Sequence, residues 1–239
     1  MNTKRIKDIR LFESDYENID GTPFPPHFGT MIFIIDDKLK STIARVCCQF
    51  TLKLRETNFQ FPGFDHLYIN FTTKIGHGEV KKTSRSKDKY HPWFQFIDCG
   101  MNMEIFSKQE DAEKIDNLIK HISLCLKTMA IDDESKEDVD NAVKCITNFG
   151  ENLEISYRKV EDKGYLINVV LKIRNDFSIE TFLVITGKDY YKNISLDIND
   201  LMQLSEALGK ISVNRKQVII KPKKNSYLEN LKEITIDLC

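Results

Sequence analysis

The sequence lacks the features that mark membrane, secreted and general DNA-binding proteins. Its longest apolar run, Met31 to Ile35, is far too short for a transmembrane helix, which needs about 20 apolar residues. The basic residues at its start are not followed by an apolar stretch, so the sequence predicts no secretory signal. Its 35 basic and 36 acidic residues leave a net charge of −1, without the positive excess of a general DNA-binding protein. We expect a cytoplasmic location and no membrane partner.

The six cysteines lack the spacing of a metal site. No two of them form a C-x-x-C pair, and no thiols cluster with histidines as a zinc site requires. The densest acidic run, which starts at Asp132, lacks the D-x-D-x-D-G spacing of a calcium loop. We therefore expect buried free thiols, no metal and no cofactor.

The common catalytic motifs are also missing. The sequence contains no nucleophile elbow, no H-E-x-x-H pair and no P-loop. Cys99 and His91 could in principle supply a nucleophile and a base, but no local motif places them together. We expect no catalytic residues, and a protein that works by binding a partner.

What is present indicates a folded α+β protein. Its 239 residues, 41% of them hydrophobic and 30% charged, suffice for one large domain or two small ones. Residues 1–28 contain a proline-rich stretch and predict an irregular N-terminal arm, because proline fixes φ and restrains the residue before it.

Residues 29–131 predict a series of strands followed by a helix. Short apolar runs and period-two alternation predict strands at 29–36, 44–54, 66–72, 93–98 and 101–106. The polar segment 76–91 is typical of a long exposed loop. Ser107 and Glu110 form an S-x-x-E capping box, and apolar residues at helical spacing then predict a helix near 108–127.

Residues 132–239 predict a similar plan after a linker helix. The acid-rich segment 132–150 predicts that helix, with Gly150 as its C-terminal stop. Strands are expected at 152–160, 165–173, 178–186 and 191–198. The links between them are short and turn-prone, which indicates antiparallel hairpins. A helix near 199–211 and a strand at 215–222 complete the pattern.

The two halves together predict two antiparallel β-β-β-β-α repeats, which form either one pseudo-symmetric domain or two domains. This order of elements resembles the Whirly class of folds, whose members bind single-stranded nucleic acid. The resemblance covers residues 29–222 as a pattern of elements. The lysine-glycine-lysine-alanine segment of the plant Whirly proteins is absent.

A second resemblance lies in the residues themselves. The segments FDHLYINFT, residues 64–72, and WFQFIDCG, residues 93–100, are similar to bacterial immunity proteins that neutralise polymorphic or contact-dependent toxins. Some of those immunity proteins are thought to have Whirly-like folds. The resemblance implies a non-catalytic cytoplasmic inhibitor that masks a cognate toxin domain, often a nuclease. It transfers no functional residues, because immunity interfaces differ from pair to pair.

An inhibitor of a nuclease should present acids, because the cleft of a nuclease is usually basic, with aromatic residues as anchors. The expected partner-binding residues are Asp132, Asp133, Glu134, Glu137, Asp138, Tyr190 and Tyr191. A solvated helix N-terminus also explains the acids, because the helix dipole favours negative charge there.

A basic loop is the alternative binding surface. It suits an acidic toxin surface or single-stranded nucleic acid, with cations on phosphates and the nearby Trp93 stacking on a base. Its cations are Lys81, Lys82, Arg85, Lys87 and Lys89. An exposed hairpin tip kept soluble by its lysines also explains this segment.

Overall fold

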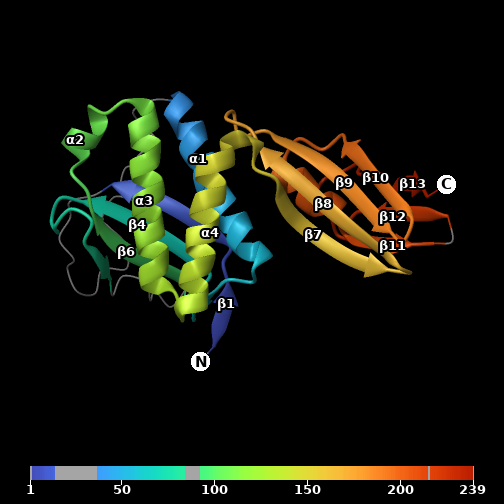
Figure 1. Ribbon diagram of the computed structural model, residues 1–239, viewed down its shortest axis with the longest axis horizontal. Coiled ribbons are helices and arrows are strands. Elements are labelled where there is room, and N and C mark those ends of the chain that lie inside the picture. Colours follow the sequence, from blue (N-terminus) through green and yellow to red (C-terminus); the bar gives the residue numbers. More distant parts are fainter. Residues whose placement is uncertain (1, 14–36, 84–91, 215, 239) are drawn as a thin grey trace. The chain divides into compact units, whose positions relative to one another are not determined.

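The computed structural model of the protein describes residues 2–13, 37–83, 92–214 and 216–238 (Figure 1). The chain divides into two compact units, Met1–Gly150 and Glu151–Cys239. The protein is a mixed α+β protein that contains several antiparallel sheets. Within the described residues, no helix is both long enough and apolar enough to span a membrane.

The first unit is built on a four-stranded mixed sheet. β2 (Asp8–Glu13), β4 (His66–Thr72) and β6 (Phe94–Gly100) are parallel neighbours. β5 (Val80–Lys82) pairs antiparallel with β6 and closes the order β2-β4-β6-β5. The antiparallel arrangement predicted for the first repeat is therefore wrong, because a long helix lies between β2 and β4 and lets the chain cross over to a parallel neighbour.

That crossover is α1 (Asp37–Glu56), which occupies the strand predicted at 44–54. The apolar residues Val46, Phe50 and Leu54 are four positions apart, and this spacing fits both a strand face and a helix face. Leu39 and Ile43 continue the same buried face at helical spacing. The strand predicted at 29–36 lies outside the described residues.

Two further helices correct the sequence-based boundaries. The predicted strand at 101–106 is mostly α2 (Met103–Ser107), because the Asn102 side chain caps it by accepting a hydrogen bond from the Ile105 N–H. The capping box of α3 (Asp111–Met129) starts at Glu110 rather than Ser107. The backbone N–H of Glu110 donates to Glu113 Oε2 at 3.4 Å.

The predicted linker helix is α4 (Asp133–Phe149), with Asp132 as its N-cap and Gly150 as its C-cap. Gly150 has a φ of 51°, in the region that favours glycine. α4 contacts α1 and α3, and buried Gln49 on α1 donates to the Gly150 carbonyl at 2.6 Å. Sequence reasoning divides the chain after residue 131, whereas these contacts place α4 in the first unit.

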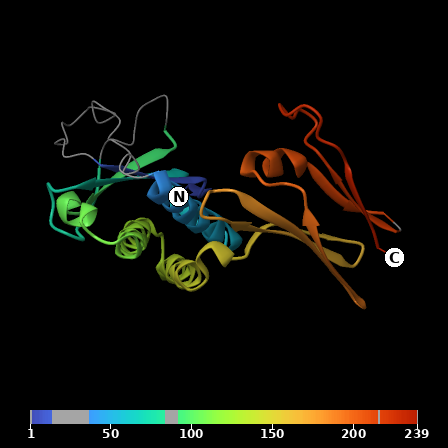
Figure 2. The same cartoon turned by 90° about the horizontal axis from the view of Figure 1, so that it is seen from above.

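The core of the first unit lies between its sheet and its helices. Figure 2 shows α3 in green and α4 in yellow on one side of the sheet. The sheet face that carries Leu67, Ile69 and Phe71 is fully buried. A short antiparallel pair, β1 (Thr3–Arg5) with β3 (Gln60–Pro62), completes this unit.

The second unit contains two antiparallel sheets. The four predicted strands are confirmed as one meander, with the order β10-β9-β8-β7. Its strands are β7 (Ile155–Asp162), β8 (Tyr165–Ile173), β9 (Ile179–Gly187) and β10 (Tyr190–Leu196). The turn Lys163-Gly164 joins β7 to β8 with φ values of 50° and 80°, which is typical of a tight two-residue hairpin.

The remainder of the second unit differs in detail from the prediction. The helix expected near 199–211 is shorter, because α5 (Leu201–Ala207) ends before Gly209 and Ile211 lies on β11. The second sheet has the order β11-β12-β13 and consists of β11 (Lys210–Val213), β12 (Gln217–Lys221) and β13 (Ile234–Asp237). The β-β-β-β-α order is thus present in the second unit, whereas the first unit has a different, parallel topology.

Candidate functional site

The five predicted acids lie together at the beginning of α4. Asp132 accepts a hydrogen bond from the Ser135 N–H at 2.8 Å, and its hydrogen bonds with Ser135 lower the pKa of Asp132. Asp133 forms an ion pair with Lys136 at 2.8 Å. Glu134 and Glu137 are exposed and Asp138 is half-buried. The structure therefore gives Asp132 and Asp133 local roles in α4.

The predicted tyrosines belong to the second unit and the acids to the first. Tyr191 on β10 is 69% exposed, the highest exposure among the large hydrophobic residues of the described chain. Tyr190 is half-buried, with its ring edge-on to Tyr165 at 5.8 Å between centroids. Its hydroxyl donates to the Asp237 carbonyl at 3.4 Å, which fixes the ring on the sheet. The structure therefore does not bring the acids and the tyrosines together within one unit.

The alternative basic loop is described only at its start. Lys81 and Lys82 are exposed on β5, at the edge of the mixed sheet. The other three predicted cations, Arg85, Lys87 and Lys89, lie outside the described residues. These two lysines therefore represent the predicted loop in the structure.

Sequence reasoning missed an open pocket of about 480 Å³ in the first unit. It is lined by Lys4, Arg5, Lys7, Asp65, His66 and Trp93. We call it the Lys4–Trp93 pocket. β1 supplies the first two residues, and the amino-terminal ends of β4 and β6 supply the last three. The lining combines three basic side chains with an imidazole and an indole around one carboxylate.

Backbone hydrogen bonds hold the walls of the Lys4–Trp93 pocket together. The N–H groups of Asp65 and His66 donate to the Trp93 carbonyl at 3.1 and 3.2 Å. The Lys7 N–H donates to the Asp65 carbonyl at 2.7 Å. Arg5 is fixed through Nη2, which donates to the Arg55 carbonyl at 2.5 Å. The pocket residues are thus positioned by the sheet and not by a free loop.

Asp65 organises the charges in the Lys4–Trp93 pocket. Its buried carboxylate forms an ion pair with Lys7 Nζ at 2.9 Å and contacts His66 Nδ1 at 2.5 Å. Burial raises the pKa of Asp65, but the hydrogen bonds from Lys7 and His66 outweigh burial, and the pKa lies below its ordinary value. Asp65 is therefore a carboxylate at neutral pH. It offsets one of the three basic side chains, so the pocket favours an anion.

A second polar cluster lies near the carboxyl ends of β4 and β6. Buried Asn70 donates through Nδ2 to Asp98 Oδ1 at 3.0 Å. His121 on α3 is 1% exposed, and its Nδ1 donates to the Asn117 carbonyl at 2.7 Å. Its Nε2 has no hydrogen-bond partner among the described residues, and burial lowers the pKa of His121. His77 lies edge-on to this ring at 5.1 Å between centroids.

The buried cysteines of the first unit are not activated as nucleophiles. Burial raises the pKa of Cys47 and Cys125, and it raises that of Cys48 to about 12, so these three remain thiols at neutral pH. His91, proposed as the partner of Cys99, lies outside the described residues. In the described part of the chain, no group of three or more His, Cys, Asp or Glu side chains is arranged to hold a metal ion.

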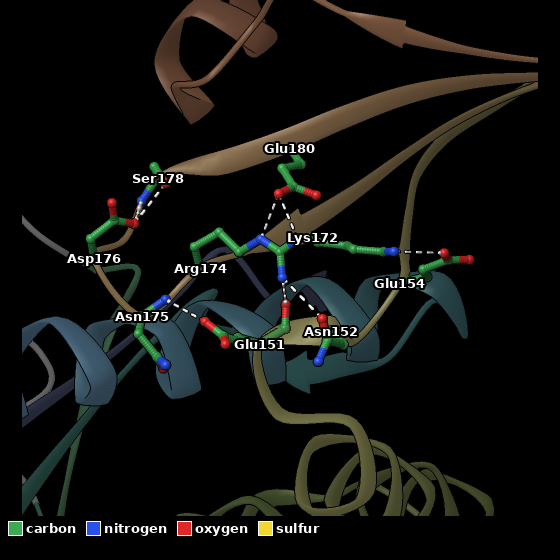
Figure 3. A network of polar contacts seen from close by, with 9 residues as sticks. All are labelled: Glu151, Asn152, Glu154, Lys172, Arg174, Asn175, Asp176, Ser178 and Glu180. Carbon is green, nitrogen blue, oxygen red and sulfur yellow. Dashed lines mark hydrogen bonds and ion pairs between the residues drawn. The ribbon is translucent and has the colours of Figure 1, made fainter.

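The second unit has a polar network of its own, drawn in Figure 3. Arg174 forms an ion pair with Glu180 at 2.5 Å and donates to Asn152 Oδ1 at 3.0 Å. The Asn175 N–H donates to Glu151 Oε2 at 3.3 Å. These bonds join the segment before β7 to the β8–β9 hairpin. The network ties strands together and is a structural feature of the sheet.

Comparison of the chain with protein-family models, with curated proteins and with solved structures found no match.

Proposed function

We propose that this chain is a non-catalytic binding protein of the immunity type, which binds and neutralises a cognate toxin domain through the exposed acids at the beginning of α4. The supporting observation is the concentration of carboxylates in residues 132–138. Complementary charge accelerates association with a basic partner and fixes its orientation. A nuclease toxin offers such a partner, because its cleft must attract a polyanion.

The acids have different parts in this proposal. Asp132 caps the helix and Asp133 pairs with Lys136, so both have local stabilising roles. Glu134, Glu137 and Asp138 supply the charge that the toxin meets. Ile131, directly before the cap, is 45% exposed and gives the acids an apolar neighbour in the same unit. An apolar residue beside charged ones is the usual composition of an interface centre with a polar rim.

Charge reversal tests this proposal. The triple variant Glu134→Lys, Glu137→Lys and Asp138→Lys should slow association with the toxin domain encoded by the neighbouring gene, and the defect should shrink at high salt. Cells that carry the variant should lose protection against that toxin. Asp132 and Asp133 stay in place, so the helix cap is kept.

The matched control reverses three exposed acids at the other end of the α3–α4 pair. Glu104→Lys, Asp111→Lys and Asp116→Lys introduce the same charge change in the same unit. These residues lie on α2 and on the first turns of α3, whereas α4 begins directly after the last turn of α3. Equal slowing by the two triple variants would show that net charge, and not the start of α4, controls association. A neighbouring gene that encodes no toxin would count against the whole proposal.

Single-stranded nucleic acid is the second candidate partner. It is favoured by the β-β-β-β-α order of the second unit, in view of the resemblance of that order to Whirly folds, and by the exposed Lys81 and Lys82 of the first unit. Binding to phosphates should fall steeply as the salt concentration rises, because it releases condensed counterions. A chain that binds its toxin but no oligonucleotide at physiological salt removes this alternative.

A further inference from the structure

We propose that the Lys4–Trp93 pocket binds a nucleoside phosphate, with the phosphate held by Lys4 and Arg5 and the base stacked on Trp93. This inference does not depend on the toxin proposal. The pocket lies in the first unit, and all of its lining residues are described. Its charge, its preorganised polar groups and its indole each point to a part of the ligand.

The charge of the pocket selects an anion. In the described part of the chain, no carboxylate forms an ion pair with Lys4 or Arg5, whereas Asp65 engages Lys7. Arg5 uses Nη2 to bind the Arg55 carbonyl, and a guanidinium carries further N–H donors in a planar fork. That fork matches two oxygens of a phosphate, and Lys4, which also lines the pocket, adds a point charge.

Asp65 holds two more donors in position at the pocket. Because it accepts from Lys7 and from His66 Nδ1, both side chains are fixed before a ligand arrives. Groups that are already ordered lose less entropy on binding, so their contacts contribute more to affinity. Since Nδ1 of His66 faces Asp65, Nε2 is the ring nitrogen that can contact the ligand.

Trp93 and the size of the pocket indicate more than an inorganic ion. The indole is half-exposed and lies edge-on to Phe94 at 5.7 Å between centroids. An indole that lines a pocket together with basic side chains is the usual combination for a base with its phosphate. The volume of about 480 Å³ is that of a small-molecule site, which typically spans roughly 300–1,000 Å³. A nucleoside phosphate uses both parts of the pocket.

The experiment follows the fluorescence of Trp93, which is the single tryptophan of the chain and therefore reports on this site alone. Adenosine monophosphate, inorganic phosphate and a short single-stranded thymidine oligonucleotide are titrated separately into the full-length chain. The proposal expects saturable quenching by the mononucleotide or by the oligonucleotide, and weaker binding of inorganic phosphate. The first result identifies a free nucleotide as the source of the ligand, and the second identifies a nucleic-acid strand.

Variants locate the site. Lys4→Ala with Arg5→Ala should weaken binding about tenfold or more, because it removes the two cations proposed to hold the phosphate. Lys120→Ala with Lys144→Ala is the matched control, with the same change of charge at exposed positions of α3 and α4 in the same unit. Trp93→Phe, followed by calorimetry, should weaken nucleotide binding but not phosphate binding. Circular dichroism shows that each variant is folded before its binding is compared.

Three outcomes would overturn the proposal. The first is the absence of quenching by both the mononucleotide and the oligonucleotide. The second is equal weakening by the Lys4/Arg5 and Lys120/Lys144 variants, which would indicate non-specific attraction to positive charge. The third is equal affinity for phosphate and nucleotide, which would remove the role of Trp93.

Discussion

The two units place ion pairs in different surroundings. In the first unit, the Asp65 side chain is 7% exposed and lies at a pocket with Lys7 and His66. In the second, the Glu180 side chain is 44% exposed and pairs with Arg174 on a hairpin. The nitrogen–oxygen distances of the two ion pairs are similar. Loss of the partner is costly only for Asp65, because its carboxylate is buried.

This difference in burial distinguishes a candidate binding site from a contact that only links strands. A buried carboxylate that loses its partner cannot recover the lost bonds from water, so Asp65 fixes its neighbours strongly. An exposed carboxylate exchanges its partner for water at little cost. We therefore assign a binding role to the surroundings of Asp65 and a structural role to the Arg174 network.

The largest expected effects come from charges placed in each core. Ile122 on α3 and Leu204 on α5 are both fully buried. Ile122→Asp and Leu204→Asp should each cost about 3 kcal/mol or more of unfolding free energy, because each buries an unpaired charge. Amide hydrogen exchange should show lost protection in the unit that carries the substitution. Equal loss in both units would contradict the view that each unit has its own core.

Asp65→Asn should have the next largest effect. The variant loses a charged acceptor for Lys7 and His66, at a cost of about 1–3 kcal/mol near neutral pH. Because folding lowers the pKa of Asp65, its contribution is present above the ordinary value and is lost as the pH falls through the lowered one. Urea unfolding followed by Trp93 fluorescence should therefore show the difference from the parent protein shrinking in acid. A difference that is constant with pH would exclude the charged form as its cause.

His121 should also make the stability of the first unit depend on pH, in this case because folding favours the neutral form of a buried imidazole. Burial lowers its pKa from the ordinary value of 6.5, so the unfolded chain takes up the proton first as the pH falls. The unfolding free energy is therefore not reduced by protonation of His121 above about pH 6.5, and it decreases below that pH. His121→Gln should reduce that slope in urea unfolding, whereas His77→Gln at an exposed position should keep most of it. An unchanged slope in the His121 variant would assign the effect to other groups.

The smallest effect is expected for Glu180→Gln in the second unit. The pair with Arg174 is partly exposed, and such pairs contribute about 0–1 kcal/mol. Thermal unfolding of this variant should stay close to that of the parent protein, and the small difference should disappear at high salt. A loss as large as that of Asp65→Asn would break the comparison between the two units.

The sequence predicted the second unit better than the first for a local reason. Strands β7 to β10 alternate clearly and are joined by tight turns such as Lys163-Gly164, so neighbouring residues determine the pairing. In the first unit, the spacing of Val46, Phe50 and Leu54 fits a helix as well as a strand. Whether this segment forms a helix or a strand depends on its packing against β2, and the residues of the segment alone do not specify that contact.

The candidate sites follow the same division. The acids of 132–138 lie close together in the sequence, so their grouping at the start of α4 could be predicted from the sequence. The Lys4–Trp93 pocket combines Lys4, Asp65 and Trp93, which lie far apart in the chain and meet through strand pairing. The only local signal is the basic stretch at the start of the chain, and by itself it does not indicate a pocket.

The most direct test of the proposed function is hydrogen exchange on the complex with the toxin domain. The amides of residues 132–140 should exchange more slowly when the toxin is bound, because the partner covers the beginning of α4. The amides of β5 and β10 should exchange at the rates of the free chain. Protection confined to Tyr190 and Tyr191, or to Lys81 and Lys82, would contradict the proposal and move the interface to that surface.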